Sequence, residues 1–205
     1  MNMIYWNYLL ALEEDLEKVS RYIEFSEENF KTYSIELAHL FLAITSELDV
    51  IFKEYCKLIN STSDADNINK YFQIINQNSS YLLNETIYCP RFSLEFTPFE
   101  GWQESSPPHW WTMYNKVKHH RNTHFKEANL ENVLQAMSAL LIVNFYFYKK
   151  ILEVKAGNDL EQKQVHLKLI PNTKLMKMQD IYYYKQIFVD SDKSQKGNLY
   201  LEMEK

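Results

Sequence analysis

The chain has 205 residues, of which 46% are hydrophobic and 24% charged, so it resembles average soluble proteins and can bury one core. Its net charge of −5 excludes a protein that is basic throughout, so any nucleic-acid contact must come from the local basic patch at residues 116–126. Three glycines cannot supply a glycine-rich phosphate loop and argue against a turn-rich all-β fold.

Amphipathic patterns predict three helices in the first part of the chain. In residues 3–25, leucines recur at steps of three and four with charged residues between them. Residues 31–60 repeat this pattern, and Thr32 or Ser34 can cap the helix start. After a tract of turn-forming residues, a shorter helix is predicted at 67–83.

Two further helices are predicted in the second part of the chain. The first covers residues 107–124, because Pro107 and Pro108 suit a first helical turn. The second covers 129–155, with Asn129 as its cap, and is the most apolar of all. Its longest apolar run is shorter than the roughly 18 residues of a membrane helix, so we expect it at the centre of the bundle and expect no membrane contact.

The remaining segments lack helical periodicity. Residues 85–104 predict an irregular insertion over the bundle, and residues 180–190, DIYYYKQIFVD, have the β-branched and aromatic content of a strand. The sequence therefore predicts a mainly α fold: an antiparallel bundle of about four to five helices in a domain of residues 1–155. A small β-containing C-terminal tail or appendage, residues 156–205, is expected to follow.

The cysteines and the N-terminus bear on the cellular compartment. Cys56 and Cys89 have no zinc-binding spacing, and acidic residues stand where a signal peptide would have its cleavage region. These features predict a cytoplasmic protein with reduced thiols and no cofactor.

The stretch WWTMYNKVKHHRNTHF, residues 110–125, gathers three of the six histidines beside basic residues. On a helix this stretch presents a polar stripe on the same face as Trp111, toward the C-terminal end. The stripe consists of Asn115, Lys118, His119 and Asn122. Glu47 interrupts the apolar stripe of the helix at 31–60, and a buried carboxylate needs a partner. We therefore expect Glu47 to contact Lys118 or His119.

WWTMYNKVKHHR, followed by FKEANLENVLQAMSALLIV, resembles a pattern in uncharacterised bacterial members of the HEPN (higher eukaryotes and prokaryotes nucleotide-binding) superfamily. The earlier segment YSIELAHLFLAITSELDVIFK resembles another helix of that group, so the resemblance spans residues 30–150. It implies a bundle of four or five helices that is often a homodimer. Many such proteins are metal-independent ribonucleases of toxin–antitoxin or abortive-infection systems, so RNA and a cognate protein are the implied partners.

HEPN ribonucleases use an arginine followed, after four to six residues, by a histidine. Here the corresponding positions after Arg121 hold no histidine, and the nearest match is Lys118 with five residues before His124. In a catalytic site the resemblance implies His124 and His119 as acid and base, and Lys118 and Arg121 as phosphate contacts. Asn115 and Glu47 would then orient these groups.

Other interpretations of the same residues stay open. The polar cluster can be structural, with Asn115, His119 and Glu47 buried and bonded, in a non-enzymatic module for protein interactions. Trp110, Trp111 and Tyr114 can stack on nucleobases or fill the core. His120 and His124 have metal-ligand spacing, but no acid or cysteine stands at ligand spacing nearby.

Overall fold

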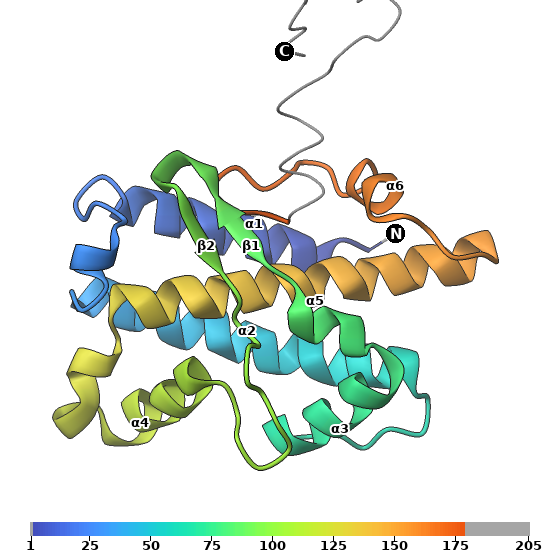
Figure 1. Cartoon of the computed structure of the whole chain (residues 1–205), viewed down its shortest axis with the longest axis horizontal. Coiled ribbons are helices and arrows are strands. Elements are labelled where there is room, and N and C mark those ends of the chain that lie inside the picture. The colour runs from blue at the N-terminus through green and yellow to red at the C-terminus, as the bar shows by residue number, and fades with distance from the viewer. Residues whose placement is uncertain (1, 179–205) are drawn as a thin grey trace, which may run out of the picture.

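The structure, a computed structural model, describes residues 2–178 (Figure 1). It confirms a mainly α fold with a small antiparallel sheet. The helices are α1 (Ile4–Val19), α2 (Ile35–Ile59), α3 (Ile68–Asn78), α4 (His109–His124), α5 (Leu130–Ala156) and α6 (Gln162–His166). The strands are β1 (Ile87–Cys89), β2 (Leu94–Phe96) and β3 (Lys177–Met178). Short 3₁₀ turns are η1 (Glu27–Asn29), η2 (Ser80–Asn84), η3 (Pro90–Phe92) and η4 (Phe125–Glu127).

Helices α2 and α5 form the central pair of the bundle and make its most extensive contact. They run parallel, and their first turns are joined where the Leu130 and Glu131 amides donate to the carbonyls of Thr32 and Phe30, at 2.9 and 3.1 Å. Figure 1 shows α1 and α4 running in the opposite direction on either side of this pair. Consecutive long helices are therefore antiparallel, as predicted.

The caps explain where the central helices begin and end. The Ser34 hydroxyl accepts from the Leu37 amide, and the Asn129 side chain accepts from the Asn132 amide, so both predicted caps are confirmed. Helix α5 ends at Ala156, and the next residue, Gly157, has a φ of 71°, in the left-handed region that glycine adopts without strain.

Two predicted helices are shorter than expected. Helix α1 ends at Val19, and the Ser20 hydroxyl donates to the Glu17 carbonyl where the chain turns. Helix α3 ends at Asn78, and the residues that follow form η2. In both places residues that form local turns replace the last predicted helical turns.

The apolar composition of α5 follows from its position in the core. Its length and hydropathy would allow it to cross a membrane, yet 89% of its most apolar 18-residue window is buried inside the protein. The aromatic residues Phe145 to Tyr148 are all buried, and Phe147 packs edge-to-face on Tyr5 of α1. Packing against neighbouring helices thus accounts for these residues.

The predicted irregular insertion contains β1 and β2, and the strand order is β2–β1–β3. Ile87 of β1 stands opposite Phe96 of β2 and Met178 of β3, and all three are buried. The last described segment of the chain therefore completes a sheet with the insertion. The strand expected at residues 180–190 lies outside the described residues.

Residues 157–178, here called the C-terminal strap, belong to the same core as the bundle. Buried strap residues include Val165, Leu169, Leu175 and Met176. The buried Glu13 carboxylate of α1 accepts hydrogen bonds from three strap amides at 2.9 to 3.0 Å. The part of the tail that the structure describes therefore packs against the bundle, and the expected division of the chain at residue 155 stays a prediction.

Candidate nucleic-acid interface

The first half of α4 is anchored in the core by its aromatic residues. Trp110, Trp111 and Tyr114 are buried, and the Trp110 indole N–H donates to the Pro98 carbonyl at 2.7 Å. Tyr114 packs edge-to-face on Phe41 of α2. The prediction that these aromatic residues fill the core is confirmed, and the alternative that they stack on nucleobases is wrong.

The second half of α4 departs from a straight helix. His120 has non-helical backbone angles, φ −137° and ψ 44°, which kink the helix. All buried residues of α4 lie at or before Val117, so tertiary packing holds only the part before the kink. The last turn, Arg121 to His124, is consequently displaced from the axis that the sequence pattern predicts.

The polar stripe of α4 faces solvent. Asn115, Lys118, His119 and Arg121 are exposed, and His124 is half-buried. Within the described part of the chain, no side chain among these five makes a hydrogen bond or an ion pair. The interpretation of Asn115 and His119 as buried, mutually bonded core groups is therefore wrong.

Glu47 is half-buried on the side of α2 that meets α1 and α5, not on the side that meets α4. Its charge acts on the hydroxyls of Tyr5 in α1 and Tyr148 in α5, and burial raises the pKa of its carboxyl. Among the described residues it pairs with neither Lys118 nor His119, so the predicted contact is wrong. Helical periodicity placed Glu47 within the apolar stripe of α2. It could not predict which neighbouring helix packs against that side of α2.

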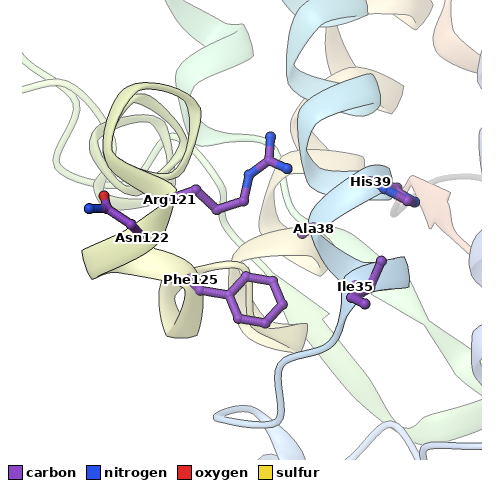
Figure 2. A pocket seen from close by; sticks show the side chains of 6 residues that line it. All are labelled: Ile35, Ala38, His39, Arg121, Asn122 and Phe125. Carbon is purple, nitrogen blue, oxygen red and sulfur yellow. The ribbon is translucent and has the colours of Figure 1, made fainter.

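An open groove of about 510 Å³ lies between the start of α2 and the end of α4. Its lining consists of Ile35, Ala38, His39, Arg121, Asn122 and Phe125. Figure 2 shows that Arg121 and Phe125 extend toward α2, whereas the amide of Asn122 points away from it. The volume lies within the roughly 300–1,000 Å³ that small-ligand sites occupy.

The electrostatics around the groove favour an anion. None of its six lining residues is acidic. Residues 105–126 contain no aspartate or glutamate, although the whole chain has a net charge of −5. Lys118 lies one turn before Arg121, with its ammonium 5.4 Å from the centre of the Tyr114 ring. Lys118 is exposed and does not itself line the groove.

Among the described residues, one predicted site residue, Arg121, lines the groove, and the other predicted site residues do not. Arg121 lines the groove, and His124 follows it by three residues at the end of α4. Asn115 and His119 are exposed on α4 but do not line the groove, and Glu47 lies elsewhere.

Sequence reasoning missed His39, an exposed residue of α2 that lines the groove. It lies between Ala38 and Leu40, off the apolar stripe of α2, where solvent exposure is ordinary. Only the position of the kinked end of α4 brings an arginine to the groove that His39 also lines. No sequence signal could have paired the two helices at this point.

Other chemistries have less support in the described residues. No cluster of three histidine, cysteine, aspartate or glutamate side chains there could hold a metal ion. Burial raises the pKa of both thiols, Cys56 and Cys89, to about 12, so neither is a reactive thiolate at neutral pH. The groove with Arg121 and His39 is therefore the candidate site.

Comparisons of this chain with protein-family models, with curated proteins and with solved structures find no match. The resemblance to HEPN proteins therefore stays a hypothesis.

Proposed function

We propose that the protein binds RNA at the groove between α2 and α4 and cleaves it without a metal ion, as an HEPN-like protein of bacterial defence or toxin–antitoxin type. One observation carries the proposal: an arginine and a histidine from two different helices line the same open groove, and no carboxylate of the described residues lines it. Guanidinium binds phosphate through two donors, and imidazole exchanges protons near neutral pH.

The absence of internal partners supports a role in binding. Buried polar groups of a protein are normally paired, and surface cations commonly pair with nearby acids. Within the described residues, the Arg121 side chain makes no hydrogen bond and no ion pair. The Lys118 ammonium contacts only the aromatic ring of Tyr114. Their charges are therefore available to a phosphate backbone without first breaking a contact within the protein.

The proposed reaction is an internal transesterification. The ribose 2′-oxygen attacks the adjacent phosphorus, the bond to the 5′-oxygen breaks, and the products carry a 2′,3′-cyclic phosphate and a 5′-hydroxyl. A base accepts the 2′-hydroxyl proton, and an acid donates a proton to the leaving 5′-oxygen. Arg121 and Lys118 would hold the phosphate. His39, which lines the groove, and His119 and His124 of α4 are the candidate imidazoles for the two proton transfers.

The test is cleavage of a mixed RNA pool in EDTA by the wild-type protein and by single alanine variants of His39, His119, His124 and Arg121. The control is His109→Ala, because His109 is exposed on the same helix but stands at its other end. We expect cyclic phosphate products from the wild type and from His109→Ala. Loss of Arg121 and of at least one site histidine should reduce the rate at least a hundredfold.

Circular dichroism of each variant separates loss of activity from loss of folding. Equal cleavage by all variants would point to a contaminating nuclease and contradict the assignment. RNA binding through Arg121 without cleavage would leave an RNA-binding relative that lacks catalysis. Absence of both binding and cleavage would favour the alternative, a module for protein interactions.

A further inference from the structure

An aromatic pair flanks the groove beside Arg121. Phe125 lines the groove, and Tyr33, just before α2, packs against it edge-to-face with ring centres 5.4 Å apart. Tyr33 is 50% exposed, and the next groove residue along the chain, Ile35, is 64% exposed. A partly exposed aromatic surface thus lies next to the guanidinium of Arg121, which has no partner among the described residues.

The backbone holds Tyr33 in position although its ring is half in solvent. Tyr33 forms an isolated antiparallel bridge with Asn129, the residue that caps α5. The amide of Leu130 donates to the neighbouring Thr32 carbonyl at 2.9 Å. The ring therefore projects from a segment fixed to both central helices, so a ligand would meet a surface that is already ordered.

Phosphate recognition and base stacking need these two kinds of side chain side by side. Arginine binds the phosphate group, and aromatic rings stack on unpaired bases. Figure 2 shows Arg121 and Phe125 directed into the same space from the end of α4. The groove, at about 510 Å³, is of the size that small ligands occupy. In duplex RNA the bases are already stacked on one another and cannot reach such a ring.

We propose that the groove is a subsite for one unpaired nucleotide of RNA, whose base stacks on the Tyr33 and Phe125 pair while its phosphate contacts Arg121. This inference rests on the proposed function, because it names the form of RNA that the site accepts. It predicts a preference for single strands that depends on Tyr33.

The test measures binding by fluorescence anisotropy of a labelled 12-nucleotide 2′-O-methyl oligouridylate and of a 2′-O-methyl duplex of equal length. The methyl group blocks attack by the 2′-oxygen, so binding is measured without cleavage. The variants are Tyr33→Ala, Tyr33→Leu, Arg121→Gln and Tyr8→Ala. Tyr8 is the matched control, since it is 49% exposed on α1 and does not line the groove. Tyr33→Leu keeps an apolar side chain against Phe125 but removes the aromatic ring.

We expect both Tyr33 variants to weaken single-strand binding about tenfold, with little change for the duplex. Tyr8→Ala should match the wild type, and Arg121→Gln should weaken both ligands. Single-strand binding by the Tyr33 variants equal to that of Tyr8→Ala would overturn the subsite, while an Arg121 effect would leave the proposed function standing. Absence of binding to either ligand by the wild type would overturn both.

Discussion

The contact between α1 and the C-terminal strap differs sharply from the end of α4. At the strap, the buried Glu13 carboxylate accepts hydrogen bonds from three backbone amides. The Trp6 indole N–H donates a hydrogen bond to the Pro171 carbonyl at 2.8 Å. At the end of α4, Arg121 is exposed and has no partner among the described residues. Polar groups are satisfied within the protein in the first region and left to solvent in the second.

This difference separates a structural role from a binding role. A buried charge whose hydrogen bonds are all internal stabilises the fold and offers nothing to a ligand. An exposed cation without an internal partner contributes little to stability but can bind an anion without first breaking a contact. Substitutions in the two regions should therefore change different quantities.

The largest effect is expected for Glu13→Ala, which should lower the free energy of unfolding by about 3 kcal/mol because three strap amides lose a charged acceptor. Chemical denaturation measures this loss. Hydrogen exchange should show faster exchange of the amides of Lys174, Leu175 and Met176. The exposed neighbour Glu14 is the control, and Glu14→Ala should change stability by no more than about 0.5 kcal/mol. Equal losses in the two variants would contradict a structural role for Glu13.

Arg121→Gln should show the reverse pattern, with stability unchanged within about 0.5 kcal/mol and RNA affinity reduced about tenfold. The slope of log affinity against log salt should fall by about one unit, because one phosphate contact is lost. Arg21→Gln makes the same charge change at an exposed site after α1. It should leave stability, RNA affinity and the salt slope at their wild-type values. A large stability loss in Arg121→Gln would mean that the comparison between the two regions is wrong.

Tyr146→Phe should lower stability by about 1 kcal/mol, because the Tyr146 hydroxyl donates to Glu85 and accepts from Gln162 of α6. Burial, and then the Glu85 carboxylate, raises the pKa of Tyr146 above its ordinary value of 10.0. The stabilisation is thus complete below pH 10 and is lost as pH rises further, since the unfolded chain ionises first. Denaturation of both proteins at pH 7 and pH 11 should show a smaller difference at pH 11. Tyr8→Phe, at an exposed site, is the control.

The smallest effect is expected for Glu47→Gln, which should raise stability at pH 7 by no more than about 0.5 kcal/mol. Burial raises the pKa of Glu47, so folding disfavours its charged form. As pH falls through the raised pKa, the carboxyl becomes neutral and the advantage of glutamine disappears. Denaturation at pH 7 and pH 4 checks this sign. A loss of stability at pH 7 would instead indicate a charged partner for Glu47.

The sequence predicted the central elements of the fold from local patterns. Ser34 and Asn129 cap α2 and α5 as expected, because a cap depends on a side chain and an amide three residues later. The apolar composition of α5 likewise predicted its central position. The ends of α1 and α3 were predicted less well, because local turns there compete with the last helical turns.

The candidate site was predicted only in part. The cations and histidines of α4 were found from composition, and Arg121 does line the groove. The contribution of His39 and the position of Glu47 depend on which helices meet, and periodicity along one helix does not contain that information. The kink at His120 also required the structure, because the helical pattern of the sequence continues through His120 while its backbone angles are non-helical.

By itself, the sequence determined which residues form helices, which helix is the most apolar, and where basic residues gather without acids. These properties depend on neighbours within a few positions along the chain. Only the tertiary structure decided that the strap folds back onto Glu13, that Tyr33 and Phe125 pair, and that Arg121 and His39 line one groove. Contacts between residues far apart in the chain depend on how whole helices pack, and the free energy of that packing is shared among many side chains.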